Sequence, residues 1–181
     1  YHLVLLCENE TGYRNLSYMV SRGYLDGFYN RPRVDMELLR EHHEGIIALS
    51  ACLAGRVPQA LLHDRYEEAK KAAMEYAEIF GPEHFYLELQ DHGLEEQPRV
   101  NQGILRLSQE TGLPLVVTND AHYLRREDAR TQDILMCIQM GKTVDDTNRL
   151  KFETEEFYLK SEAELRERFP QADEAFANTV K

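Results

Sequence analysis

The chain has 181 residues, of which 43% are hydrophobic and 29% are charged, and this composition is ordinary for one globular domain with a sizeable core. It has no run of about 18 apolar residues, which argues against a membrane span, and no secretory signal at its start. The formal net charge is −11. Because nucleic-acid phosphates are normally bound by clustered Lys and Arg, we do not expect this surface to hold DNA by itself.

The number and spacing of the cysteines indicate the redox state of the compartment in which the protein folds. Three cysteines, an odd number without any CxxC pair, argue against a disulfide framework and favour a reducing, cytoplasmic location. The sequence begins with Tyr1, not Met, directly inside an apolar run. We therefore expect it to be a piece of a longer protein.

Apolar periodicity and turn residues predict strands that alternate with helices. The expected strands are residues 2–6, 46–49, 85–89 and 115–117. The expected helices are residues 11–22, 35–43, a short segment after Pro58, 65–80, 96–111 and 126–139. This alternation predicts an α/β fold of parallel βαβ units, in a barrel or an open sheet. Four strands are too few to close a barrel by themselves.

The last of these helices and the residues after it differ in character from the rest. Ile134, Leu135, Cys137 and Ile138 share one apolar face of the helix, so we expect them to be buried. Residues 142–152 are polar and expected to be extended, a Ser-x-x-Glu capping box at residues 161–164 predicts a helix, and residues 174–180 begin another. We expect residues 1–141 to form one partial domain and residues 142–181 to connect to a following domain.

The strand at residues 115–117 carries the strongest chemical signal. It is a short apolar run, typical of a strand buried on both faces, and Thr118 to His122 then turn polar. Asp120 and His122, two residues apart, project to the same side of an extended chain. A carboxylate and an imidazole together suit Zn²⁺, Mn²⁺ or Fe²⁺. The alternative is that Asp120 caps the next helix and His122 is an ordinary loop residue.

Three further residues are candidates because of their place relative to the strands. His2 lies in the first strand, Cys52 follows the second, and His92 follows the third. Each has a simpler alternative: a core or edge histidine for His2, a small buried thiol for Cys52 and a turn residue for His92. Because Cys52, His92 and the Asp120/His122 pair all fall at strand ends on one expected rim, we interpret them together as a possible metal site. Glu88, within the third strand, could face a barrel interior or the surface.

Seven strings occur in an order that matches one family. The strings are Thr11-Gly-Tyr-Arg-Asn-Leu16, Gly27-Phe-Tyr-Asn-Arg-Pro-Arg33, Leu49-Ser-Ala-Cys-Leu53, Leu87-Glu-Leu-Gln-Asp-His-Gly93, Thr118-Asn-Asp-Ala-His-Tyr123, Phe157-Tyr-Leu-Lys-Ser161 and Ala177-Asn-Thr-Val180. In these strings the chain closely resembles the PHP (polymerase and histidinol phosphatase) domain found in alpha subunits of bacterial DNA polymerase III, the C-family replicative polymerases. The resemblance covers nearly the whole length.

The resemblance implies part of a distorted (β/α)7 barrel with a multi-metal cluster at one rim. Of the family's ligands, His2, Cys52, Asp120 and His122 have matching positions here, with Zn²⁺ or Mn²⁺ as the implied metals. Cys52 replaces a histidine of the stand-alone phosphoesterases, and a thiolate still binds Zn²⁺ well. The resemblance implies catalytic roles for Asp120 and His122, and places His92 behind the ligands as a supporting residue.

The chain also departs from the family. The amino-terminal His-x-His, the following Asp-His string and a glutamate would all precede Tyr1, and the polymerase carboxylates that use Mg²⁺ would follow Lys181. We therefore expect this piece alone to be inactive.

Two functions are implied for the intact domain: metal-dependent 3′–5′ exonuclease-type hydrolysis, or an inactive module that braces the polymerase and seats a separate proofreading subunit. The implied partners are the rest of the alpha subunit, the proofreading subunit and the sliding clamp, with DNA contacted mainly by other domains. A free-standing phosphatase for a small phosphate monoester is a third possibility, which the connecting tail disfavours.

Overall fold

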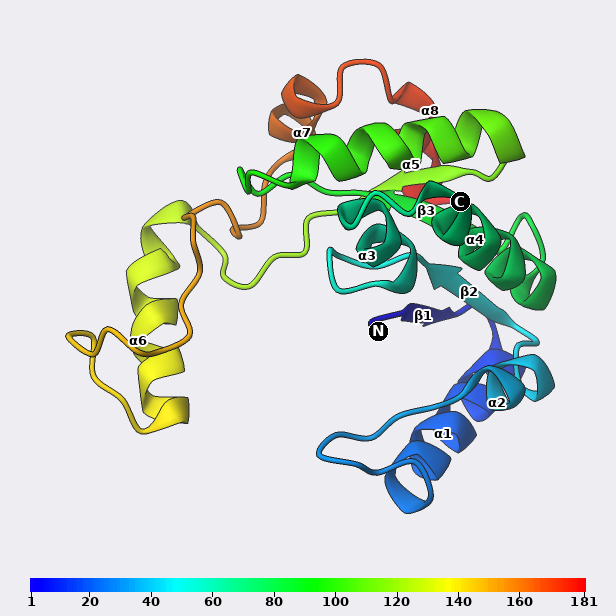
Figure 1. Cartoon of the computed structure of the whole chain (residues 1–181), viewed down its shortest axis with the longest axis horizontal. Helices are drawn as coiled ribbons and strands as arrows, with labels where there is room; N and C mark the ends of the chain where they lie inside the picture. Colours follow the sequence, from blue (N-terminus) through cyan, green and yellow to red (C-terminus); the bar gives the residue numbers. More distant parts are fainter.

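The computed structural model describes all 181 residues as a four-stranded sheet with helices around it (Figure 1). The strands are β1 (Val4–Cys7), β2 (Ile46–Leu49), β3 (Phe85–Leu89) and β4 (Leu115–Val117). The helices are α1 (Glu10–Leu25), α2 (Met36–Glu41), α3 (Arg56–Leu62), α4 (Tyr66–Phe80), α5 (Gln97–Thr111), α6 (Ala129–Met140), α7 (Glu162–Arg168) and α8 (Asp173–Ala177), with 3₁₀ turns η1 (Arg126–Asp128) and η2 (Asn178–Val180). The α/β fold predicted from the sequence is confirmed.

The strands follow one another across the sheet in the order β1-β2-β3-β4. Strands β2, β3 and β4 are parallel, as predicted, but β1 is antiparallel to β2, and here the prediction is wrong. The reason lies in the connection: Cys7 pairs with Ile46, and the Glu8 N–H donates to the Gly45 carbonyl at 2.9 Å. Residues 8–45, including α1 and α2, therefore leave and re-enter the sheet at the same end instead of crossing over it.

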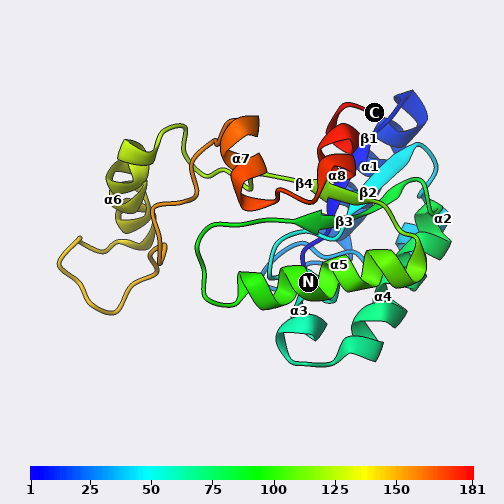
Figure 2. The same ribbon diagram turned by 90° about the horizontal axis from the view of Figure 1, so that it is seen from above.

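The main core lies between one face of the sheet and α3, α4 and α5, which Figure 2 shows together on one side. Helix α4 contributes a row of small buried residues, Ala69, Ala72, Ala73 and Ala77, so the helix can approach the strands closely. The opposite face carries a smaller cluster of Leu49, Tyr86 and Val116. All five residues of β3 are buried, because this strand has neighbours on both edges and packing on both faces.

Helix α6 and the loop after it stand away from the sheet (Figures 1 and 2). Cys137 is buried, as predicted, but Ile134, Leu135 and Ile138 are 42%, 55% and 71% exposed, so their predicted burial is wrong. Helical spacing identifies which side chains share a face, but it does not say whether another element covers that face. None of the helices has the length and apolar character that crossing a membrane requires.

The chain returns to the sheet after residue 156. The His122 N–H donates to the Phe157 carbonyl at 2.8 Å, and the Asn178 side-chain amide donates to the Leu115 carbonyl of β4 at 2.8 Å. Leu165, Phe169 and Phe176, from α7 to α8, join the main core. The second half of residues 142–181 is thus packed on the sheet, and the proposed boundary at residue 141 stays a prediction.

The contact between the start of α1 and the turn before β2 offers a test of the fold. Gly12 is buried, and a Cβ added there would lie 1.8 Å from the Gly45 carbonyl oxygen, so the backbone would have to move. We expect Gly12→Ala to lower the free energy of unfolding by about 1–3 kcal/mol or more, in the range of overpacked interiors. Ser17→Ala, at an exposed position of the same helix, is the control and should change stability little. Equal denaturant midpoints for the two variants would contradict the expected contact.

Candidate metal centre

The first pair of candidate ligands is His2 and Cys52. Because β1 is antiparallel to β2, its start lies beside the carboxyl end of β2, where His2 N–H donates to the Ala54 carbonyl at 3.0 Å. His2 Nδ1 then lies 3.5 Å from Cys52 Sγ. Zn–S of about 2.3 Å and Zn–N of about 2.0–2.1 Å around a tetrahedral ion separate the two ligand atoms by about 3.6 Å, so the observed spacing suits two ligands of one metal.

The second pair is Asp120 and His122, beyond the carboxyl end of β4. His122 Nε2 lies 3.6 Å from Asp120 Oδ1, and both side chains remain partly exposed. Asp120 has a left-handed backbone (φ 44°), which is uncommon for residues other than Gly. Arg125 and Asp128 occupy the N-cap positions of η1 and α6, so Asp120 caps neither, and this alternative reading of its role is excluded.

The structure places these four residues at one edge of the sheet as two pairs. Burial raises the pKa of the Cys52 thiol, and the negative charge of Asp120 acts in the same direction to a smaller extent. No group of three or more His, Cys, Asp or Glu side chains in the chain is arranged to hold a metal ion. The donor types and the spacing within each pair fit a divalent metal, but a complete coordination shell needs ligands in addition to either pair.

His92 is buried behind the Asp120 loop and is fully engaged by protein groups. Its Nδ1 accepts from the Gln97 side-chain amide at 2.8 Å, so Nε2 carries the proton and donates to the Asn119 carbonyl at 2.7 Å. The ring stacks on Phe157 with centroids 4.3 Å apart and an interplanar angle of 5°. Burial lowers the pKa of His92, which favours the neutral ring that these contacts require. This residue thus orients the backbone just before Asp120.

Asn119 completes this support, a role that the sequence pattern did not predict. Its side chain donates to the Lys160 carbonyl and accepts from the Lys160 N–H, both at 3.0 Å, and so joins the end of β4 to the returning chain. Its position directly before Asp120 and close to His122 could have indicated a supporting role. Its partner could not be predicted from the sequence, because Lys160 lies 41 residues away.

Of the two positions that the sequence allows for Glu88, a barrel interior or the surface, the structure shows a buried one (5% exposed). Its carboxylate lies between the ends of β2 and β4 and accepts hydrogen bonds from both sides. The sequence did contain one indication of this burial: Glu88 lies in the third of four strands, and a strand inside a parallel sheet is covered on both faces.

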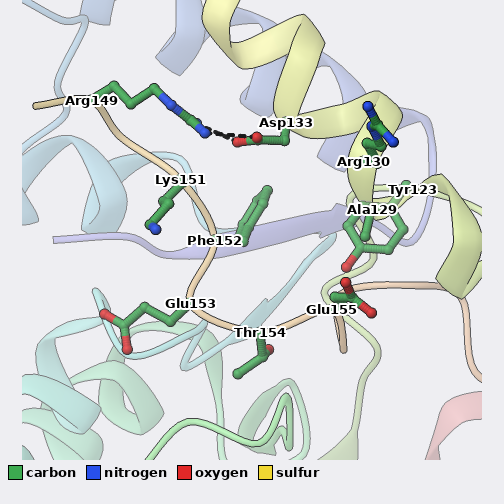
Figure 3. Close-up of a pocket in the computed structure, with 10 residues that line it drawn as sticks. All are labelled: Tyr123, Ala129, Arg130, Asp133, Arg149, Lys151, Phe152, Glu153, Thr154 and Glu155. Carbon is green, nitrogen blue, oxygen red and sulfur yellow. Dashed lines mark hydrogen bonds and ion pairs between the residues drawn. The ribbon is translucent and has the colours of Figure 1, made fainter. Parts of the chain in front are cut away.

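A cavity of about 430 Å³ lies beside the second pair, between α6 and residues 149–155 (Figure 3). Phe152 contributes to its wall and also packs against His122, with ring centroids 4.8 Å apart. The Arg149 guanidinium pairs with the Asp133 carboxylate across its upper side. Three basic and three acidic side chains line the cavity, so its lining does not select for anions: Arg130, Arg149, Lys151, Asp133, Glu153 and Glu155.

Comparison with known families adds to this geometry. The PHP domain family matches residues 1–92, just over half of the chain. The chain belongs to the PHP domain family. The match includes β1 to β3 and the His2–Cys52 pair, whereas Asp120 and His122 lie outside it.

Individual relatives match the whole chain. It is 50% identical over 181 residues to the DNA polymerase III subunit alpha of Treponema pallidum and 48% identical over 181 residues to that of Borreliella burgdorferi. It is also 47% identical over 184 residues to the DNA polymerase III subunit alpha of Thermus aquaticus. In each case 100% of the chain aligns, but it spans only 15–16% of the relative's length.

The neutral state of His92 leads to a prediction about pH. Because the folded-state pKa is below the unfolded value of about 6.5, the unfolded chain binds the proton more readily. The stability that His92 contributes is present above pH of about 6.5 and is lost as the pH falls through its folded-state pKa. We expect the free energy of unfolding to fall more between pH 7 and pH 5 in the wild type than in His92→Gln. Parallel pH profiles from chemical denaturation would contradict the assignment.

Proposed function

We propose that this chain is part of the alpha subunit of a bacterial DNA polymerase III. The observation that carries the proposal is identity of up to 50% along the entire chain to proteins of that name. The parent protein would then catalyse template-directed nucleotidyl transfer with Mg²⁺, using residues outside this chain. Its partners would be the rest of the alpha subunit, a separate proofreading subunit and the sliding clamp, in the cytoplasm. The net charge of −11 supports DNA contacts made mainly by other domains.

Within that protein, we propose that His2, Cys52, Asp120 and His122 contribute ligands to a centre for Zn²⁺ or Mn²⁺. Support comes from the two donor pairs, with separations of 3.5 Å and 3.6 Å, at the same edge of the sheet. When bound, such metals supply an activated water and stabilise charge on a phosphodiester. The remaining ligands would come from other parts of the parent protein.

The proposed reaction is 3′–5′ exonuclease-type hydrolysis of a phosphodiester. Asp120 and His122 are suited to it because both are partly exposed and reachable by a substrate, whereas His92 and Asn119 hold the backbone behind them. Aromatic contacts of His122 with Phe152 and Phe157 restrict the orientation of the imidazole. The residues of this chain thus position Asp120 and His122 while both side chains stay partly exposed.

We expect Asp120→Asn in the whole alpha subunit to reduce metal-dependent release of 3′ nucleotides by about 100-fold, since even partners behind a ligand cost about 10–100-fold. The variant removes a charged ligand oxygen but keeps the shape of the side chain. Asp145→Asn, an exposed acid in the loop after α6, makes the same change of charge away from the centre and should leave the rate unchanged. If Asp120→Asn keeps its fold, metal content and full rate, the exonuclease role is wrong.

The second candidate is a docking module in which a metal only stabilises the domain. The exposed apolar face of α6, with Leu135 and Ile138, favours it, because apolar surface of this kind often marks contacts with other protein. A metal that raises the melting temperature of the whole subunit without conferring nuclease activity would support this role over hydrolysis.

A further inference from the structure

Glu88 connects the two halves of the candidate centre. It lies in β3, between the strands that lead to Cys52 and to Asp120. One carboxylate oxygen accepts from the Ala51 N–H at 2.7 Å. The other accepts from the Thr118 hydroxyl at 2.5 Å and from the Gln90 side-chain amide at 3.1 Å. One buried group thus joins the ends of β2 and β4.

The residues that Glu88 holds stand directly beside candidate ligands. Ala51 precedes Cys52 and has a left-handed backbone (φ 64°), a conformation that an alanine adopts only when its surroundings impose it. Thr118 is two residues before Asp120, which is also left-handed. The Glu88 N–H in turn donates to the Ser50 hydroxyl at 2.8 Å. Glu88 therefore holds the turn after β2 through its backbone N–H as well as through its side-chain carboxylate.

A carboxylate at this position costs folding free energy. Burial raises the pKa of Glu88, and the nearby Asp120 charge acts in the same direction, against the favourable effect of the hydrogen bonds. Hydrophobic residues of similar volume are often at least as stabilising at buried ionic sites. The contacts to Ala51 and Thr118 therefore point to a role in geometry in addition to packing.

We propose that Glu88 is a positioning residue that sets the separation between the Cys52 side and the Asp120 side of the candidate metal centre. This inference rests on the proposed function, because it assumes that both pairs take part in metal binding. Residues that orient metal ligands without touching the metal affect affinity through the ligand positions they allow.

The test is Co²⁺ titration of the whole alpha subunit, followed by the thiolate-to-cobalt charge-transfer absorption. Cys52→Ser identifies the part of the signal that belongs to Cys52. Glu88→Ala is expected to weaken Co²⁺ affinity in that signal by about 10–100-fold, as loss of groups behind metal ligands typically does. Thr118→Val, which removes one arm of the contact with little change in volume, should weaken it by a smaller factor.

Glu88→Gln is the conservative variant and should retain most of the affinity. Its amide oxygen can accept from the Ala51 N–H, while its NH₂ faces Thr118 and Gln90. Gln90 Oε1 is buried without a hydrogen-bond partner, so Gln90 can present this oxygen to the new donor by rotating its own amide. A role that depended only on the charge of Glu88 would not be rescued in this way.

Leu107→Ala is the matched control for general destabilisation, because Leu107 is fully buried in α5 among the main core. It should lower the melting temperature without changing the Cys52-dependent Co²⁺ affinity. Unchanged affinity in both Glu88→Ala and Thr118→Val would overturn the inference, as would an equal loss in Leu107→Ala. If Glu88→Ala does not fold, Thr118→Val and Glu88→Gln decide. A wild type without any Cys52-dependent signal would overturn the metal centre, and the inference with it.

Discussion

The parallel alignment of β2, β3 and β4 brings three carboxyl ends to one edge of the sheet, and the polar interior of the molecule gathers there. Buried polar groups are stable only when they are hydrogen-bonded, so each turn that leaves this edge is held by a specific partner. Glu88 holds the turns after β2 and β4, and Gln97 and His92 hold the turn after β3 and the loop after β4. The candidate ligands lie on backbone that this network orders.

The antiparallel β1 gives this edge an additional donor. A parallel β1 would have placed its start, and His2 with it, at the opposite end of the sheet from Cys52. Because residues 8–45 return to the end they left, the beginning of β1 lies beside the end of β2, and His2 forms a bridge with Gly55. The departure from the regular βαβ pattern is therefore what makes the His2–Cys52 pair possible.

The returning segment after α6 ties the opposite side of the centre to the core. The Phe157 ring stacks on His92 and contacts the His122 ring, and the Phe157 carbonyl accepts a hydrogen bond from the His122 backbone N–H. Lys160 pairs through its backbone with the Asn119 side chain. Between these contacts and β4, α6 projects outward with an apolar face that this chain does not cover. The Asp120–His122 pair thus lies between the packed core and α6, whose apolar residues Leu135 and Ile138 are exposed in this chain.

The sequence by itself determined the elements. Strands at residues 46–49, 85–89 and 115–117 have the predicted bounds. Two helices end as predicted at Phe80 and Thr111, each directly before a glycine. These features depend on local causes, namely apolar runs, turn residues and caps, which neighbouring residues reveal. The ordered family strings likewise pointed to a PHP domain, and the match over residues 1–92 confirms it.

Only the tertiary structure decided which of these residues meet. The direction of β1, the exposure of Ile138, the burial of Glu88 and the contact of Asn119 with Lys160 all depend on partners far away in the chain. Periodicity assigns a side chain to one face of an element, but what covers that face is set by packing between elements. For the same reason the sequence could predict that Cys52, Asp120 and His122 share one rim, but only the structure could bring His2 to Cys52, with His2 Nδ1 3.5 Å from Cys52 Sγ.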